Sequence, residues 1–168
     1  MEKNAFVEPA PLLGYIDPRP LIKAPAVEVS RPARGCEIMV VGVGVDLVSV
    51  ARVERAYRRR PRRFLRRIFS AAELSLLLPR RAFFPAMAAR FAAKEAVLKA
   101  IGCGAGPASW KEVEIIAPPG REPQVRLSGV AARLAEERGI GRIALSMTHE
   151  PPFAGAIAVA CRSQNREA

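Results

Sequence analysis

The chain has 168 residues, of which 50% are apolar, and a formal net charge of +11 at pH 7. This length suits one domain with one core, no apolar run reaches the length of a membrane span, and the N-terminus lacks the pattern of a secretory signal. Cys36, Cys103 and Cys161 lie far apart and match no CxxC spacing. We therefore expect free thiols in a reducing, cytoplasmic compartment, and the positive charge favours an anionic partner.

Residues 1–38 differ in composition from the rest of the chain. They hold six of the 15 prolines, and their five basic and five acidic side chains balance to zero. Proline removes amide donors and breaks periodicity, and neither helical nor strand patterning is visible here. We predict a mobile, proline-rich N-terminal tail over 1–38, a folded domain over 39–162 and a short C-terminal tail over 163–168.

Periodic segments follow one another from Met39 onward. "MVVGVGVD" (39–46) predicts a buried strand, and residues 49–60 have helical spacing. Ser70 and Glu73 form a capping-box pattern that begins a second helix. The remaining segments are a long helix over 83–101, strands over 112–117 and 124–127, a helix over 129–138, and strands over 142–149 and 154–161. This order predicts a mixed α+β domain: strand, helices, two strands, helix, two strands.

The long helix carries charge where its pattern calls for apolar side chains. Its bulky apolar residues recur at helical spacing, but the expected member between Phe91 and Leu98 is Lys94, with Glu95 beside it. A lysine on a core-facing stripe must snorkel, find a partner or face a cavity. Glu95 and Lys99 are four residues apart and can pair. An ordinary solvated face with one ion pair within the helix explains the pattern as well.

Asp46 ends the first strand and either caps the next helix or holds a metal ion. The preceding glycines do not form a dinucleotide motif, because Leu47 stands where GxGxxG requires its third glycine. Gly42 and Gly44 instead favour close backbone approach within the sheet.

The stretch "SMTHE" places Ser146 and Thr148 on one face of a strand that ends near His149, the only histidine. A strand edge with polar residues turned to water is the plain alternative. A lone histidine makes no zinc site, and no GxSxG motif supports a hydrolase.

Together, these stretches resemble one family. "GVGVD", "FSAAE", "RFAAKEAVLKAIG" and "SMTHE" occur in the order found in holo-acyl-carrier-protein synthases, the small bacterial 4′-phosphopantetheinyl transferases. The resemblance covers about residues 39–162, although the family's usual "GTG" after the long helix is "GCG" here. It implies the 4′-phosphopantetheinyl transferase fold and transfer of the phosphopantetheine arm of coenzyme A to a serine of apo acyl carrier protein. Adenosine 3′,5′-bisphosphate is then released, in support of fatty acid biosynthesis.

The resemblance also assigns roles to residues. It implies Mg²⁺ held by Asp46 and Glu95. It implies catalytic roles for Glu95, Lys99 and His149, although it leaves the general base open between Glu95, His149 and a metal-polarised water. The residues that it implies for coenzyme A binding are Arg90, Lys94, Lys99, Gly102, Ser146 and His149.

The family is trimeric, with each active site at a subunit interface, so the resemblance implies a homotrimer.

The first helix of the family docks on acidic acyl carrier proteins, and nine arginines lie in the segment from Arg52 to Arg67 here. A solvated helix with an ordinary arginine excess is the alternative. Few stacking aromatics interrupt the segment, which argues against nucleic-acid binding, and we expect no membrane partner. The residues expected to dock the carrier are Arg52, Arg59, Arg62 and Arg63.

Overall fold

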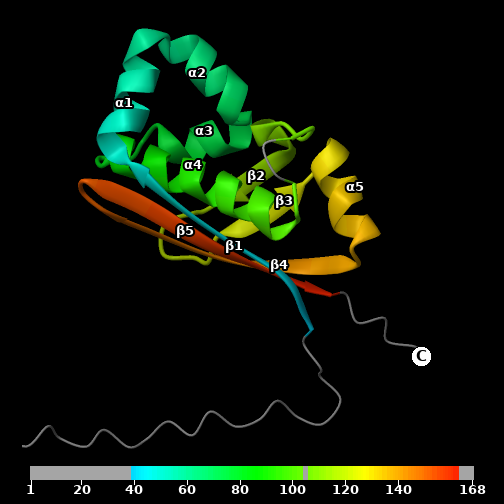
Figure 1. The fold of residues 1–168 in the computed structure, drawn as a ribbon. Coiled ribbons are helices and arrows are strands. Elements are labelled where there is room, and N and C mark those ends of the chain that lie inside the picture. The colour runs from blue at the N-terminus through cyan, green and yellow to red at the C-terminus, as the bar shows by residue number, and fades with distance from the viewer. Residues whose placement is uncertain (1–38, 104–105, 163–168) are drawn as a thin grey trace, which may run out of the picture. The chain divides into compact units, whose positions relative to one another are not determined.

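The computed structural model describes residues 39–103 and 106–162. Our predictions for the two tails, 1–38 and 163–168, lie outside the described residues. The predicted order of elements is confirmed (Figure 1). The helices are α1 (Val50–Arg59), α2 (Pro61–Ile68), α3 (Ala71–Leu77), α4 (Phe83–Ala100) and α5 (Gly129–Glu137), with a 3₁₀ turn η1 at Trp110–Glu112. The strands are β1 (Val40–Ser49), β2 (Val113–Ile116), β3 (Gln124–Leu127), β4 (Ile140–Glu150) and β5 (Phe153–Arg162).

Two antiparallel sheets organise the fold around α4. The larger sheet has the order β1-β5-β4, and β2 pairs with β3 in the smaller one. Figure 1 shows α4 lying across one face of the larger sheet. The buried residues of β5 are small, with Ala156, Ala158 and Ala160 in the core cluster. Small side chains on the sheet let the helix approach closely, so α4 is buried on nearly all sides.

Gly42 and Gly44 let β1 touch α4 backbone to backbone. A Cβ at Gly42 would lie 2.0 Å from the Ala100 carbonyl oxygen, and one at Gly44 would lie 1.9 Å from that of Ala96. The predicted close approach therefore exists, but it is made to the helix and not within the sheet. It holds Asp46, two residues after Gly44, beside the last turns of α4.

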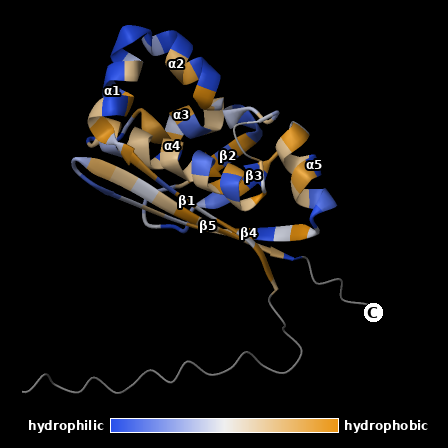
Figure 2. Ribbon diagram, in the orientation of Figure 1, coloured by the Kyte–Doolittle hydropathy of each residue, from blue (hydrophilic) through white to orange (hydrophobic). Residues whose placement is uncertain are grey.

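The prediction that β1 is a buried strand is wrong for one of its faces. Val43, Val45 and Leu47 are 58%, 64% and 68% exposed, while Gly44 between them is buried. In the adjacent β5, Phe153 and Ile157 are exposed on the same side, since Ile157 pairs with Val45. None of the described elements covers this face, and Figure 2 colours β1 and β5 largely as hydrophobic. We call these five residues the apolar sheet face.

Local signals set the helix ends. The predicted capping box is confirmed: the Ser70 side chain accepts from the Glu73 amide, and the Glu73 carboxylate accepts from the Ser70 amide. Gly102 ends α4 with a φ of 71°, and the amides of Gly102 and Cys103 donate to the carbonyls of Lys99 and Leu98. This Schellman geometry favours glycine at position 102. The sequence pattern did not predict α2, which begins at Pro61.

Two further expectations concern thiols and membranes. Cys103 and Cys161 are free, as predicted, whereas Cys36 lies outside the described residues. In the part of the chain that the structure describes, no helix is both long and apolar enough to cross a membrane.

Candidate active site

The charged residues of α4 lie on two different sides of the helix. Residues four apart differ by about 40° around an α-helix, whereas residues five apart differ by about 140°. Glu95 therefore shares a side with Lys99, and Arg90 shares a side with Lys94. The residues that sequence analysis grouped as one phosphate and metal site are thus divided by the helix between two regions.

Asp46 and Glu95 line one cavity of about 550 Å³, which we call the carboxylate cavity. Most of its other lining residues are apolar and come from β1, α1, α2, α4 and η1. They are Leu47, Val48, Arg52, Val53, Ala56, Phe64, Arg67, Ile68, Phe91 and Trp110. Two carboxylates that are 49 positions apart in the sequence are therefore brought to one hollow. Of the two roles considered for Asp46, the helix cap is taken by Ser49, whose side chain caps α1. The role of a metal ligand stays open to Asp46.

Lys99 pairs with Asp46 and not with Glu95, contrary to our expectation of a pair within the helix. Its ammonium lies 2.8 Å from Asp46 Oδ1 and donates to the Val45 carbonyl oxygen at 2.8 Å. The Lys99 side chain is 49% exposed. The close crossing of β1 over α4 makes this partner available. Lys99 consequently places a positive charge, partly open to solvent, at one of the two carboxylates.

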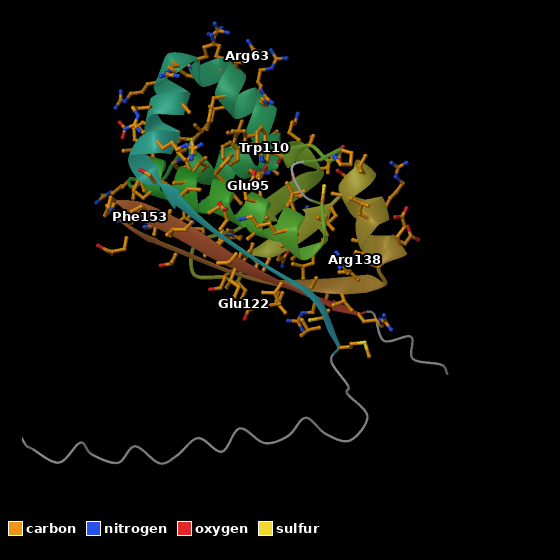
Figure 3. All side chains as sticks on the ribbon, in the orientation of Figure 1. Arg63, Glu95, Trp110, Glu122, Arg138 and Phe153 are labelled. Atoms are coloured by element: carbon orange, nitrogen blue, oxygen red, sulfur yellow. The ribbon has the colours of Figure 1, made fainter. Side chains whose placement is uncertain are left out.

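Glu95 has a different partner, Trp110. The indole Nε1–H of Trp110 donates to Glu95 Oε1, and Figure 3 shows the two labelled residues side by side. The Trp110 ring contacts Phe91, with ring centroids 5.7 Å apart, and the Arg67 guanidinium lies 5.2 Å from the Trp110 centroid. Sequence analysis missed Trp110, whose only signal was that it is the single tryptophan.

Lys94 is fully buried and ion-paired with Glu73. Its ammonium lies 2.8 Å from Glu73 Oε1 and 2.9 Å from Oε2, and it also donates to the carbonyl oxygens of Trp110 and Val113. Burial lowers the pKa of Lys94, and the neighbouring Glu73 carboxylate opposes that change. A lysine held by this many acceptors is not available to a phosphate. The expectation that Lys94 contacts coenzyme A therefore does not fit its surroundings.

Glu73 connects three elements around that lysine. Besides capping α3 and pairing with Lys94, its Oε1 accepts from the Ile115 amide of β2 at 3.0 Å. Sequence analysis identified the cap through the Ser-x-x-Glu pattern. The pattern gave no sign of the partners on α4 and β2, which depend on tertiary packing.

Arg90, Ser146 and His149 line a second cavity, of about 970 Å³, which we call the arginine cavity. Arg80 also lines it, and sequence analysis missed that residue. The Nη2 atoms of Arg80 and Arg90 both donate to the Ala117 carbonyl oxygen, at 3.2 and 3.1 Å. The Nε atom of each has no partner among the described residues.

Two guanidinium groups converge on one carbonyl in this cavity. Burial lowers the pKa of Arg90, the charge of Arg80 lowers it further, and Glu73 acts in the opposite direction. Like charges that share a partly buried space repel each other unless an anion lies between them. The arrangement is therefore suited to a phosphate or another multiply charged anion.

Ser146 and His149 reach the arginine cavity from opposite faces of β4. Ser146 pairs with Ile157, which belongs to the apolar sheet face, whereas His149 pairs with the buried Ala154. Gly102 lies at the far end of α4, where a Cβ would come within 2.0 Å of Arg138 Nη1. Its backbone conformation accounts for the glycine, and its expected contact with coenzyme A stays a prediction.

The four residues expected to dock a carrier protein are all exposed on α1 and α2. Figure 2 colours these two helices largely as hydrophilic, and Figure 3 shows Arg63 extending outward from α2. Arg58 is neutralised locally by Glu54, at 2.7 Å. We call Arg52, Arg59, Arg62 and Arg63 the docking arginines.

Comparison with known proteins agrees with these observations. The model of the 4′-phosphopantetheinyl transferase superfamily matches residues 42–151. The holo-[acyl-carrier-protein] synthase of Desulforudis audaxviator is 49% identical over 122 residues, which span 73% of this chain and 93% of that protein. The one from Moorella thermoacetica is 42% identical over 124 residues, or 74% of this chain and 96% of that protein.

Solved structures show the same likeness. The Neisseria meningitidis holo-[acyl-carrier-protein] synthase aligns with a TM-score of 0.66 at 33% identity, covering 73% of this chain and 98% of that one. The Helicobacter pylori enzyme in complex with coenzyme A aligns with a TM-score of 0.62 at 31% identity, covering 70% and 98%. The chain belongs to the 4′-phosphopantetheinyl transferase superfamily. Within it, the chain is an enzyme of the holo-acyl-carrier-protein synthase group, as its motifs had indicated.

Proposed function

We propose that this enzyme transfers the 4′-phosphopantetheine arm of coenzyme A to a serine of an acidic apo acyl carrier protein. The serine oxygen attacks the phosphorus that bears the pantetheine arm, and the bond from that phosphorus to the bridging oxygen breaks. Adenosine 3′,5′-bisphosphate leaves, and the serine proton passes to a base. The observation that supports this proposal best is the convergence of Asp46 and Glu95 on one cavity beside Lys99. The role in fatty acid biosynthesis and the cytoplasmic location remain predictions.

The arginine cavity supports coenzyme A as the substrate. Coenzyme A carries a 3′-phosphate and a diphosphate, and the guanidinium groups of Arg80 and Arg90 bring positive charge to the wall of this cavity. Ser146 and His149 line the same cavity. A relative of known structure binds coenzyme A, which agrees with this assignment.

The two carboxylates fit a magnesium ion. Magnesium binds to one or two carboxylates and completes its coordination with phosphate oxygens and water. In residues 39–103 and 106–162, no three His, Cys, Asp or Glu side chains gather to form a complete protein cage. Asp46 and Glu95 would therefore hold Mg²⁺ together with the substrate, and the ion would neutralise negative charge on the diphosphate.

The protein's own residues then divide the remaining work. Lys99 holds a fixed positive charge where the leaving group develops negative charge, which stabilises the transition state. Of the protein groups considered as base, Glu95 shares the carboxylate cavity with Asp46, whereas His149 of the same subunit lines the other cavity. Within one subunit, this placement favours Glu95, or a water that it holds, as the proton acceptor. In an assembly that brings the two cavities of different subunits together, His149 of the neighbouring subunit would lie beside the phosphates and stays the alternative base.

The docking arginines support an acidic carrier as the acceptor substrate. All four are exposed on α1 and α2, and Arg52 also lines the carboxylate cavity. A positive surface beside the reaction site steers an acidic protein toward it and raises the encounter rate more than the final affinity. The serine of a carrier docked on α1 and α2 would therefore arrive next to Asp46 and Glu95.

The apolar sheet face supports a homotrimer. Its five residues are each between 45% and 68% exposed, and contiguous exposed apolar patches of this kind mark interaction sites. We propose that this face packs against other copies of the chain. The two cavities lie at opposite edges of the sheet, since Asp46 is on β1 and His149 is on β4. In a ring of like subunits, opposite edges meet at each interface.

The proposed trimer explains why the site residues are divided. Arg90 and Glu95 lie about 140° apart around α4, so one coenzyme A molecule would have to reach around a buried helix to contact both. We therefore propose that each active site combines the carboxylate cavity of one subunit with the arginine cavity of its neighbour.

Incubation with coenzyme A, Mg²⁺ and apo carrier protein tests the proposed reaction. Mass spectrometry of the carrier should show addition of phosphopantetheine, and addition should stop when Mg²⁺ is chelated. If varied carriers and metals give no addition, the proposed function is wrong.

A complementation experiment tests the shared site separately. Glu95→Ala and His149→Ala chains, each impaired alone, are dissociated and reassembled together. In a mixed ring, some interfaces combine an intact carboxylate cavity with an intact arginine cavity, so activity should return. Activity that stays at the level of the separate variants, although mixed oligomers form, would place each site within one subunit.

A further inference from the structure

Two consecutive residues of α4 bond to the same residue of η1. Lys94 donates to the backbone carbonyl oxygen of Trp110 at 2.9 Å, and Glu95 accepts from the indole N–H of Trp110. Lys94 is itself fixed by its buried ion pair with Glu73. Trp110 is therefore anchored through its main chain by one residue while its side chain holds the next one.

The surroundings of Trp110 leave its ring little freedom. Phe91 packs against it on the α4 side, and the Arg67 guanidinium lies over the ring from α2. An indole N–H is a donor only, so it can hold a carboxylate but cannot replace it as a metal ligand. By binding Oε1 of Glu95, it limits rotation of a side chain that would otherwise sample several rotamers.

We propose that Trp110 is a positioning residue that orients the Glu95 carboxylate for the divalent ion, with the Lys94–Glu73 pair as its support. This inference rests on the proposed function, because it assumes that Glu95 is a metal ligand. Hydrogen-bond partners of metal ligands set ligand orientation, and their loss typically lowers metal affinity or activity by about 10–100-fold. We expect the lower part of that range here, about tenfold, because Trp110 is only half-buried and water can replace its donor.

Trp110→Phe tests the proposal, because it removes the N–H and keeps a ring against Phe91. The Mg²⁺ concentration for half-maximal turnover should rise about tenfold, while the Michaelis constants for coenzyme A and carrier, measured at saturating Mg²⁺, change little. Binding of Mn²⁺ in the presence of coenzyme A and without carrier, followed by electron paramagnetic resonance, should weaken by the same factor. A merely structural role would lower the melting temperature without moving the metal dependence.

The unmodified protein offers a second measurement, which does not depend on the variant folding. Trp110 is the only tryptophan, so the ¹⁵N-labelled chain has one indole N–H resonance. That resonance should shift in Glu95→Gln, and it should shift again when Mg²⁺ is added to the wild-type protein with coenzyme A. An indole resonance that is unmoved by both changes would overturn the proposal, because it would exclude the contact with Glu95.

Two controls separate the possible results. Phe84→Leu removes an aromatic ring from the same helix, where it contacts Tyr57 and Phe83 and does not line the carboxylate cavity, and it should leave Mn²⁺ affinity within about twofold of the wild type. Adding Trp110→Phe to Glu95→Gln should weaken Mn²⁺ binding no further, because the two residues act through one contact. Equal Mn²⁺ affinity in Trp110→Phe and the wild type would refute the positioning role. Absence of Mn²⁺ binding and of transfer in the wild type itself would refute the proposed function and this inference with it.

Discussion

Replacing Lys94 by methionine keeps a side chain of similar length and removes the cation from a pair in which both side chains are 0% exposed. Glu73 then stays buried with backbone donors alone, from Ser70 and Ile115. Removing one partner of a buried ion pair costs about 3–5 kcal/mol of unfolding free energy. The two remaining donors place the expected loss near the lower end, at about 3 kcal/mol.

Lys99→Met is the matched control on the same helix. Lys99 is also ion-paired, but it is 49% exposed, and exposed ion pairs contribute about 0–1 kcal/mol. For a domain of this size, a loss of 1 kcal/mol lowers the melting temperature by about 3–4 °C. We therefore expect Lys94→Met to melt about 10 °C below the wild type and Lys99→Met to melt within about 3 °C of it.

Urea unfolding and thermal melting at one fixed protein concentration measure both variants, since an oligomer's stability depends on concentration. Coenzyme A kinetics on the same samples give a second reading. At saturating Mg²⁺, Lys94→Met should keep its Michaelis constant for coenzyme A wherever it remains folded, because Lys94 is occupied by protein acceptors. A stable Lys94→Met protein whose Michaelis constant for coenzyme A is strongly raised would refute the structural role of Lys94. Lys94 would then again be a candidate contact for a phosphate. Equal losses of stability in the two variants would also contradict the reasoning.

Three further predictions concern the site and the assembly. Asp46→Ala and Glu95→Ala should each lower turnover by orders of magnitude with circular dichroism unchanged, and a variant of normal rate would remove that residue from the metal role. Changing all docking arginines except Arg52 to glutamate should raise the carrier's Michaelis constant and flatten its salt dependence. The Michaelis constant for coenzyme A should change little. Equal increases in the Michaelis constants of both substrates would count against a docking role for these arginines. Leu47→Asp on the apolar sheet face should shift sedimentation from trimer toward monomer, and an intact trimer would place the interface elsewhere.

Local patterns predicted the local structure well. The capping box at Ser70 and Glu73, the glycine end of α4 and the alternation of β4 each depend on residues within a few positions of one another. Such signals are complete in the sequence, because the capping partners lie within one helical turn and the alternation of a strand needs only neighbouring positions of that strand. The start of α2 at Pro61 was missed although its signal is also local. Proline is favoured at the first helical position, but the many charged residues of this segment obscured its helical periodicity.

Long-range partners could not be predicted in the same way. The sequence marked Lys94 as a fault in an apolar stripe, but its partner Glu73 is 21 residues away. For Lys99, the neighbour within the helix was expected, yet the structure supplies Asp46, 53 residues away. Lys99 can reach Asp46 because β1 crosses close to α4, and Gly42 and Gly44 allow this close crossing. The sequence showed these glycines but not the element that they approach.

The buried pair at Lys94 connects stability with the proposed chemistry. A fully buried ion pair is often no more stabilising than well-packed apolar residues, so its presence on α4 calls for another reason. Lys94 holds the Trp110 carbonyl on one side, and the next residue along the helix, Glu95, is held by the Trp110 side chain on the other. The pair therefore fixes the distance between α4 and η1 at the turn that presents a metal carboxylate. If this is the role of the pair, Lys94→Met should weaken Mn²⁺ binding in the fraction that stays folded, because Trp110 loses its support. Trp110→Phe should then weaken Mn²⁺ binding less in the Lys94→Met protein than in the wild type, since both residues act through the same contact.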